Sequence, residues 1–205
     1  MAFASIVVLG YLLGSCPWGY WVVKVFRHED IRHQGSGNIG LTNVMRVHGR
    51  LIGAPVAILD VAKGFAPALL GMLLVSHTCG AVAGAAAMVG HWRPLFLRFA
   101  RGGKMVATGG GAFFALAPYV ALSGLGLWLA IFLLWGWASV ASLIVAAFMP
   151  VGVRLFGYPR PVFFFACFLL VGVVLLHRKN LSRLRRGQEN RSPVALVPRL
   201  RAALS

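Results

Sequence analysis

The chain has 205 residues, of which 59% are hydrophobic and only 12% are charged, and its mean hydropathy is +0.80. A soluble fold of this length could not bury that much apolar surface, so the composition excludes an ordinary soluble domain. The charges are unequal, because 20 Lys and Arg stand against 4 Asp and Glu and give a formal net charge of +16. In a soluble protein this surplus would indicate nucleic acid, but here it indicates a membrane protein with its basic residues on one side and no nucleic-acid partner.

Long runs without Asp, Glu, Lys or Arg define the expected helices. They cover residues 1–23, 64–92, 105–153 and 161–176, and one bilayer crossing needs about 20 apolar residues. No run alternates with the period of a barrel strand, so an all-α integral membrane bundle is expected. Division at Gly, Pro and polar breaks predicts seven transmembrane helices. In chain order they lie near 3–24, 53–75, 79–91, 105–120, 122–136, 139–156 and 161–177.

The basic residues predict the orientation of these spans. With seven spans, segments 24–52, 92–104 and 178–205 share one side and hold 17 of the 20 basic residues. The positive-inside rule places that side and the C-terminus in the cytoplasm and the N-terminus outside. A six-span alternative, with two spans in 105–153, would put the basic C-terminal end outside. We therefore expect one transmembrane domain over residues 1–181 and a basic cytoplasmic tail over 182–205 that contacts lipid headgroups.

Two features of the apolar runs have simple interpretations. Residues 13–16 look like a lipoprotein cleavage box, but no basic residue precedes them and the apolar run continues to Val23, so an uncleaved span is expected. The three cysteines lie far apart in apolar runs, which predicts neither a disulfide framework nor a metal site.

The first candidate site is a glycine-rich segment that follows the first expected span. The sequence GSGNIGLTN at 35–43 holds three glycines, which free the backbone to turn its N–H groups toward one point and bind an anion. If a helix begins near Thr42, then Thr42 and Arg46 share one face near a positive helix N-terminus. A flexible capped loop is the alternative for this segment alone. The candidate residues here are Gly35, Ser36, Gly37, Asn38, Thr42, Asn43 and Arg46.

A second candidate site precedes the fourth expected span on the same side. Gly102 and Gly103 stand next to Lys104 at the expected start of a helix, which predicts convergence of backbone donors, a point charge and the helix dipole on an anion. A basic membrane anchor is the alternative, but it does not explain the glycines beside Lys104. The GxxxxGK[ST] spacing of a nucleotide-binding P-loop is absent.

A third cluster of polar residues lies at the end of the last expected span. His177 and Asn180 are three residues apart and therefore share one helix face at the membrane surface. A lone terminal His more often bonds a helix end than it catalyses. Ser139 and Ser142, at the start of the sixth span, face the same site or bond back to their own helix.

Charged residues inside the spans are functional candidates, and Asp60 and Lys63 lie three apart in the second span. Mutual neutralisation is their expected role. With only four acidic residues in the chain, a general base has to be His91, His177 or a group on the substrate. The residues alone thus predict a site for phosphorylated substrates, lipids among them, without a metal.

Six motifs follow one another over nearly the whole chain. They are GSxPxGY in the first span, DIRxxGSGNIGxTNVxRVxG at 30–49, LDxxKG at 59–64, GHxxPxFLxF at 90–99, GGKxVATGxG at 102–111 and HRxNxxRLxxGxEN at 177–190. Together they resemble the bacterial acyl-phosphate:glycerol-3-phosphate acyltransferase family (PlsY type). The resemblance implies a multi-pass enzyme of the bacterial inner membrane, with a cytoplasmic active site, that serves phospholipid biosynthesis. It would move a fatty acyl group from acyl phosphate to the 1-hydroxyl of glycerol 3-phosphate, without a cofactor, giving lysophosphatidic acid and phosphate.

The resemblance also implies roles for the candidate residues, and it implies an upstream partner enzyme that makes the acyl phosphate. The departing phosphate would take the hydroxyl proton, so catalysis would come from positioning and from hydrogen bonds to the developing oxyanion. The acyl-phosphate head would be held by Ser36, Asn38, Thr42, Gly102 and Gly103, and glycerol 3-phosphate by Arg46, Lys104, Ser142, His177 and Asn180. The expected catalytic residues are Ser36, Asn38, Lys104, His177 and Asn180, and the expected substrate-binding residues are Gly35, Gly37, Thr42, Asn43, Arg46, Gly102, Gly103 and Ser142.

Four departures from the family pattern are expected to alter affinity or chain-length preference. Met105 stands where a further glycine is usual, and residues 100–101 add one residue before the glycine pair, so that a bulged turn would carry Lys104. Residues 135–137 replace a segment that often has an Arg and a Tyr, and Lys179 stands where an acidic residue is common. A transporter of phosphorylated small molecules is the alternative function, although the polar clusters lie on one face and no internal repeat is found.

Overall fold

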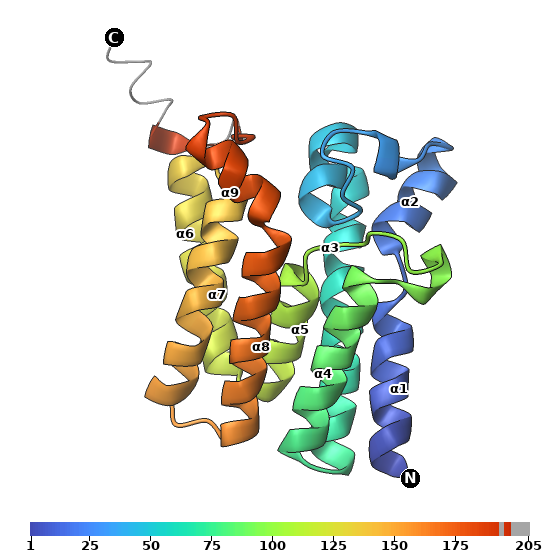
Figure 1. Ribbon diagram of the computed structural model, residues 1–205, viewed down its shortest axis with the longest axis vertical. Helices are drawn as coiled ribbons and strands as arrows, with labels where there is room; N and C mark the ends of the chain where they lie inside the picture. Colours follow the sequence, from blue (N-terminus) through green and yellow to red (C-terminus); the bar gives the residue numbers. More distant parts are fainter. Residues whose placement is uncertain (193–194, 198–205) are drawn as a thin grey trace.

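The computed structural model describes residues 1–192 and 195–197, and throughout this part the regular structure is helical, as expected. Figure 1 shows long helices running side by side, with most connections at the two ends of the bundle and the connection between α4 and α5 partway along it. The elements are α1 (Ala2–Gly14), α2 (Trp18–Arg27), η1 (Ile31–His33), α3 (Leu41–Leu74), α4 (His77–Trp92), η2 (Leu95–Leu97), α5 (Val106–Leu116), α6 (Pro118–Trp135), α7 (Ala138–Leu155), α8 (Arg160–Leu176) and α9 (Arg178–Arg185).

Every expected span coincides with a helix, the first with α1 and α2 together and the others with α3 to α8 in order. By length and hydropathy, four helical segments of the described chain could cross a bilayer, or five if the bent pair α8–α9 counts as one span. With only 11 residues, α5 is too short to cross alone. The number of seven spans and the sides of the two termini therefore stay predictions.

The first expected span is broken rather than continuous. Residues 15–17 separate α1 from α2, and Pro17 stands at the break because its ring cannot continue a helix. The break leaves the Cys16 carbonyl outside both helices, and the Lys63 ammonium of α3 donates a hydrogen bond to it at 2.9 Å. Lys63 also pairs with Asp60 at 2.8 Å between their Nζ and Oδ1 atoms, so the expected mutual neutralisation is present.

Helix α3 is kinked at Gly49, which has φ 80° and ψ 179°. Only glycine adopts this backbone conformation without strain. The kink gives the short segment at 41–48 a direction different from that of the long remainder. Thr42, Asn43 and Arg46 lie on this short segment, so the kink decides where they point.

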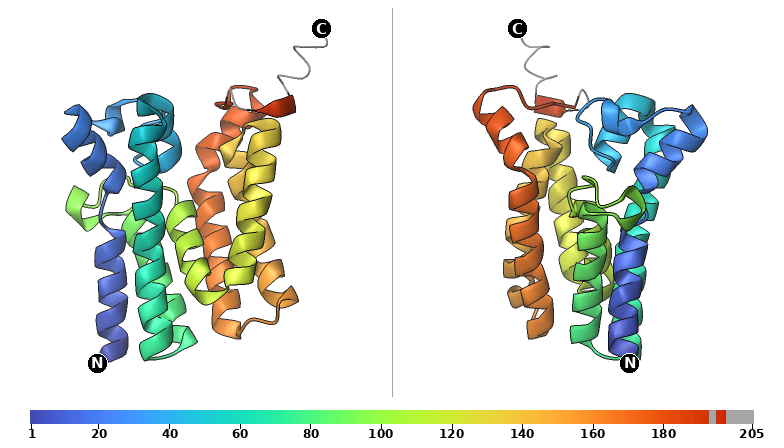
Figure 2. Two further views of the ribbon diagram at one scale, coloured as in Figure 1. Left: turned by 180° about the vertical axis from the view of Figure 1, so that it is seen from behind. Right: turned by 45° about the vertical axis from the view of Figure 1, so that its right-hand side comes forward.

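The helices form two groups joined by α5. In the first group α1 packs on α3 and α4, and in the second α7 packs between α6 and α8, while α5 contacts helices of both (Figure 2). Glycines bring the backbones close together in the first group, as is usual for membrane bundles. A Cβ added at Gly64 would lie 1.9 Å from the Thr108 carbonyl oxygen, and one at Gly111 would lie 2.0 Å from that of Val61. Helix α5 is thereby held tightly against α3 and offers its other faces to α6 and α8.

The chain after α9 returns to the turn between α6 and α7. The Arg191 Nε donates to the Trp135 carbonyl at 2.8 Å, and the Arg191 guanidinium lies 4.7 Å from the centre of the Trp137 ring. The predicted boundary at 181/182 falls inside α9, so the first residues assigned to a tail contact the bundle. Arg199 and Arg201 of that tail lie outside the described residues.

Candidate active site

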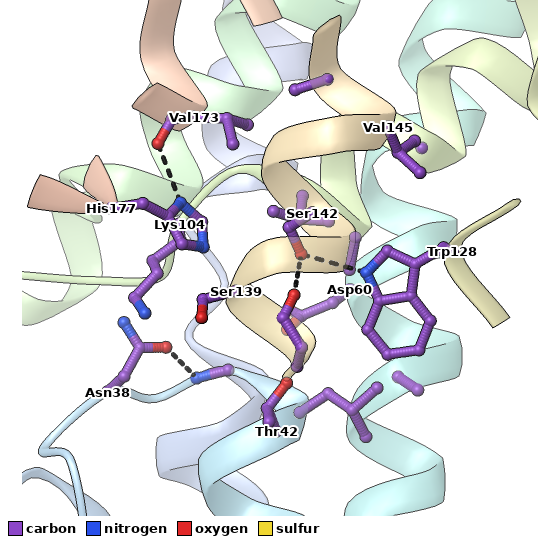
Figure 3. Close-up of a pocket in the computed structure, with 18 of the residues that line it drawn as sticks. Asn38, Thr42, Asp60, Lys104, Trp128, Ser139, Ser142, Val145, Val173 and His177 are labelled. Atoms are coloured by element: carbon purple, nitrogen blue, oxygen red, sulfur yellow. Dashed lines mark hydrogen bonds between the residues drawn. The ribbon is translucent and has the colours of Figure 1, made fainter. Parts of the chain in front are cut away.

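A cavity of about 360 Å³ opens between the two helix groups. Segments far apart in the sequence meet in it, including the loop before α3, the start of α5, the start of α7 and the end of α8. Figure 3 shows Asn38, Thr42, Lys104, Ser142 and His177 gathered around one space. The predicted site residues that line the cavity are Ser36, Asn38, Thr42, Asn43, Arg46, Lys104, Ser142, His177 and Asn180, whereas Gly35, Gly37, Gly102 and Gly103 are outside its lining.

The loop before α3 is shaped by Asn43. The Asn43 Oδ1 accepts from the Ser36 N–H at 2.8 Å, and its Nδ2 donates to the carbonyls of Gln34 at 3.0 Å and Asn38 at 2.9 Å. Gly35 has φ 58°, and a Cβ there would lie 2.4 Å from the Asn43 Oδ1, so the turn requires glycine. The buried amide of Asn43 is therefore committed to the loop, which presents the neighbouring side chains to the cavity.

The glycine pair before α5 is hydrogen-bonded to the end of α4. The Gly102 N–H donates to the Trp92 carbonyl and the Gly103 N–H to the His91 carbonyl, each at 2.9 Å. These are carbonyls of the last turn of α4, which have no partner within their own helix. Both N–H groups cap α4 in this structure, and the expected binding of an anion by Gly102 and Gly103 stays a prediction. A Cβ at Gly103 would lie 1.9 Å from the His91 Nε2, so the missing side chain lets this turn lie against the ring.

Lys104 follows the glycine pair on a turn that passes through the left-handed region. Arg98, Phe99 and Met105 have φ of 52°, 58° and 68°, a conformation that costs a residue other than glycine about 1–2 kcal/mol. The buried Met105 side chain is accommodated by α8, where a Cβ at Gly172 would lie 2.6 Å from the Met105 Sδ. The chain thus has the bulged approach to Lys104 that its extra residue suggests, with a methionine at a position that favours glycine.

Lys104 is the first member of a hydrogen-bond network that ends at Glu189. The Lys104 Nζ donates to the Asn180 Oδ1 at 2.8 Å, and the Asn180 Nδ2 donates to the Glu189 Oε1 at 2.6 Å. Glu189 also accepts from the Ser139 Oγ at 2.7 Å and from the Arg183 Nε at 2.8 Å. The network fixes both Asn180 and the chain after α9 at the cavity.

The pKa values of Lys104 and Glu189 both lie below their ordinary values, which disfavours the charged form of the lysine and favours that of the glutamate. The pKa of Lys104 is lowered to about 8, mainly by burial and also by neighbouring arginines, while Glu189 opposes the shift. Burial alone would raise the pKa of Glu189, but the hydrogen bonds from Asn180, Ser139 and Arg183 bring it below its ordinary value. Near neutral pH Lys104 is therefore mostly an ammonium group, and it lines the cavity where a phosphate could bind.

His177 and Ser142 are oriented by their own helices. The His177 Nδ1 lies 2.8 Å from the Val173 carbonyl (Figure 3), and a carbonyl oxygen only accepts, so Nδ1 carries the proton and Nε2 keeps its lone pair in the neutral ring. The Ser142 hydroxyl donates to the Ala138 carbonyl at 2.7 Å and accepts from the Trp128 Nε1 at 3.0 Å. His177 can thus accept a proton or a hydroxyl hydrogen bond, whereas the Ser142 proton is already used.

The cavity is also lined by polar residues outside the predicted catalytic and substrate-binding set, namely Asp60, His91, Trp128, Ser139, Arg183, Glu189 and Asn190. Of these, Asp60, His91 and Ser139 were candidates from the sequence. Asp60 and His91 are buried, and their Oδ1 and Nδ1 atoms lie 3.8 Å apart, which is too far for a hydrogen bond. The sequence offered a signal for Asp60 and Glu189, because acidic residues are rare in this chain and these two are half of them. Among the described residues, no group of three or more His, Cys, Asp or Glu could hold a metal ion.

The cavity has two chemically distinct parts. The polar mouth comprises Ser36, Asn38, Thr42, Arg46, Lys104, Ser142, His177 and Asn180, and the apolar depth comprises Val106, Phe114, Ala121, Gly124, Leu125, Val145, Ala146, Met149, Leu169 and Val173. A site with a few polar groups and an apolar wall suits an amphiphile, whose charged head the mouth would bind and whose hydrocarbon the depth would bury.

Residues 4–187 match a family model described as glycerol-3-phosphate acyltransferase. Curated proteins of that name are similar along nearly their whole length. The protein of Desulforudis audaxviator is 39% identical over 93% of this chain and 96% of its own, and that of Aquifex aeolicus is 40% identical over 91% and 97%. The protein of Rubrobacter xylanophilus is 42% identical over 91% of this chain and 93% of its own.

Two solved structures of PlsY (YgiH), described as an integral membrane glycerol 3-phosphate acyltransferase, have the same fold. The glycerol 3-phosphate form superimposes with a TM-score of 0.90 at 37% identity and covers 94% of this chain and 96% of that one. The lysophosphatidic acid form gives 0.88 at 36% identity, with coverage of 95% and 97%.

Proposed function

The chain belongs to the PlsY-type glycerol-3-phosphate acyltransferase family, and we propose that it moves a fatty acyl group from acyl phosphate to the 1-hydroxyl of glycerol 3-phosphate. The products are lysophosphatidic acid and inorganic phosphate. The observation that carries this proposal is a cavity in which a polar mouth, with the basic residues Arg46 and Lys104, continues into an apolar depth. The relatives solved in glycerol 3-phosphate and lysophosphatidic acid forms support it.

The polar mouth has groups for both substrates. Ser36, Asn38 and Thr42 lie on or next to the loop that Asn43 shapes, and they hold the head of the acyl phosphate. Arg46 and Lys104 bind the phosphate of glycerol 3-phosphate as cations. On the other side of the mouth, the His177 Nε2 accepts the hydrogen bond of the hydroxyl that reacts, while Asn180 and Ser142 complete the acceptor site.

The reaction needs no carboxylate base. The hydroxyl oxygen attacks the acyl carbon, the ester bond forms, and the bond from the acyl carbon to the phosphate oxygen breaks. The phosphate leaves with that electron pair and takes the hydroxyl proton, so atoms and charge balance without a cofactor. The two carboxylates at the cavity support this route, because Asp60 is paired with Lys63 and Glu189 accepts three hydrogen bonds. Catalysis then comes from alignment and from donors around the developing oxyanion.

We place the enzyme in the inner membrane of a bacterium, with seven spans, the N-terminus outside and the C-terminus in the cytoplasm. The distribution of basic residues supports this orientation, and the start of α3, the end of α8 and α9 all lie toward one end of the bundle (Figure 1). Glycerol 3-phosphate, which is soluble, enters the mouth from the cytoplasm. Acyl phosphate is supplied by a partner enzyme, and its chain enters from the lipid.

The proposal is tested with the purified full-length protein in detergent, incubated with palmitoyl phosphate and labelled glycerol 3-phosphate. Palmitoyl-CoA and palmitoyl acyl carrier protein are tried in parallel reactions. Labelled lysophosphatidic acid is expected with palmitoyl phosphate at a rate at least about 100-fold above the other donors, because these are thioesters with no phosphate bonded to the acyl carbon for the mouth to bind. A folded protein that forms no lysophosphatidic acid contradicts the proposed acyltransferase activity. Equal rates with palmitoyl-CoA contradict the proposal that acyl phosphate is the donor.

A further inference from the structure

The part of the apolar depth away from the polar mouth is lined by Phe114 of α5, Gly124 of α6 and Met149 of α7. Ser142 of the polar mouth and Met149 are seven residues apart on α7, which is about 10 Å along a helix. Val106 at the start of α5 and Phe114 are eight residues apart, or about 12 Å. An acyl chain whose carbonyl lies in the mouth therefore meets Met149 and Phe114 part of the way along its length.

At this end, Met149 rests on Gly124 of α6. A Cβ added at Gly124 would lie 2.4 Å from the Met149 Cε and 3.3 Å from the Val145 Cγ1, so the methionine methyl group fills the space that a side chain at 124 would need. Met149 is buried and both residues line the cavity. Methionine is unbranched and adapts to its surroundings, so its position depends directly on what stands at 124.

We propose that Met149, seated on Gly124, closes the acyl-chain site and limits the length of chain that the enzyme uses well. This inference rests on the proposed function, because it requires an acyl chain in the apolar depth. Removal of the thioether deepens the site and favours longer chains. A methyl group at 124 displaces the methionine, and the Cε atom, which is the far end of a flexible side chain, has to move by more than an ångström into neighbouring space. The site then becomes shorter, so the two substitutions act in opposite directions.

The test compares wild type with Met149→Ala, Gly124→Ala and a matched control, Gly126→Ala. Gly126 lies on the same helix, and a Cβ there would meet no atom within 4 Å. The control therefore repeats the glycine-to-alanine change without touching the cavity. For each full-length protein, kcat/KM is measured for lauroyl, palmitoyl and stearoyl phosphate at saturating glycerol 3-phosphate.

Met149→Ala is expected to raise the preference for stearoyl over lauroyl phosphate about tenfold, and Gly124→Ala to lower it about tenfold, the size of effect that a few methylenes have in an apolar pocket. Gly126→Ala keeps the wild-type preference. In the double variant Gly124→Ala/Met149→Ala no thioether remains to be displaced, so the preference returns to the wild-type value or above it. This reversal separates a change in cavity length from simple damage to the fold. The KM for glycerol 3-phosphate stays the same throughout.

The inference is overturned if the wild type is active and all four variants keep its chain-length profile, a result that would mean that the chain leaves the cavity before it reaches Met149. It is also overturned if both single variants shift the preference in the same direction. A wild type that forms lysophosphatidic acid from none of the three donors contradicts the proposed function instead.

Discussion

The polar mouth and the apolar depth are built in different ways, although they belong to one cavity. In the mouth, a few side chains from distant segments hold one another by hydrogen bonds, as Lys104 does with Asn180 and Asn180 does with Glu189. In the depth, large side chains fill spaces that glycines leave, as Met149 does at Gly124. Loss of a mouth residue leaves a charge or a hydrogen-bonding group without its partner, whereas a substitution in the depth changes only volume. The mouth should therefore govern rate and the depth should govern selectivity.

The largest effect is expected from Lys104→Ala. It removes the mouth's ammonium group and leaves the Asn180 Oδ1 without its donor, so kcat/KM should fall about 1,000-fold, near the upper end of what loss of one transition-state donor costs. Steady-state assays with palmitoyl phosphate measure the loss. Arg185→Ala, at an exposed basic residue at the end of α9, is the control and should keep the wild-type rate. Wild-type kinetics of Lys104→Ala would remove this residue from the mechanism.

A smaller effect is expected from Asn43→Ala, which removes the side chain that shapes the loop. Three hydrogen bonds are lost at a buried position, so we expect a decrease of about 2 kcal/mol in stability and a KM for acyl phosphate about 10-fold to 100-fold higher. Amide hydrogen exchange across residues 34–38 should accelerate. Asn43→Asp, which keeps the acceptor for the Ser36 N–H but not the two donors, should fall between wild type and Asn43→Ala. Unchanged exchange in Asn43→Ala would contradict the role of this residue.

The pH dependence of glycerol 3-phosphate binding follows from the pKa of Lys104, which is about 8. Below that pH the amine is a cation, and above it the amine is neutral and no longer attracts phosphate. A phosphate monoester carries its second charge above about pH 6. The KM should therefore be lowest between these values and rise toward about tenfold for each further pH unit on the alkaline side. Lys104→Arg keeps its charge and should lack this alkaline rise. If Lys104→Arg shows the same rise, another group is responsible.

The smallest effect is expected from Gly172→Ala, which acts on the mouth through packing alone. The new methyl group would lie 2.6 Å from the Met105 Sδ, so Met105 must shift and move the adjacent Lys104. We expect the KM for glycerol 3-phosphate to rise about threefold, the effect of a coupling below 1 kcal/mol between neighbouring residues. The double variant Met105→Gly/Gly172→Ala should recover the wild-type KM. No recovery would show that Gly172 does not act through Met105.

The positions of the helices could be predicted from the sequence because charge-free runs are long and their breaks carry Gly, Pro or polar residues. The internal irregularities could not. Pro17 did not signal that its run divides into α1 and α2, and Gly49 is one of 25 glycines, of which few stand at a kink. The break at Pro17 is accompanied by a tertiary contact, the hydrogen bond from Lys63 to the Cys16 carbonyl, which the local sequence does not reveal.

The candidate site was predictable as a set of side chains, because uncharged polar and basic residues stand out against an apolar background. Their individual functions were less predictable. Whether the N–H groups of Gly102 and Gly103 are free depends on where α4 ends, and the commitment of Asn43 to its own loop depends on the turn at Gly35. Glu189 was part of a recognised motif, but its partners Ser139 and Asn180 become neighbours only when α7 and α9 meet.

The claim that the polar mouth governs rate and the apolar depth governs selectivity is tested most directly by one set of assays. They compare Lys104→Ala and Met149→Ala, each with lauroyl and stearoyl phosphate. We predict that Lys104→Ala lowers kcat/KM by the same factor for both donors, so that their ratio stays at the wild-type value. Met149→Ala should change that ratio about tenfold while the KM for glycerol 3-phosphate stays constant. A donor ratio that moves with Lys104→Ala, or a glycerol 3-phosphate KM that moves with Met149→Ala, would contradict the separation of rate from selectivity.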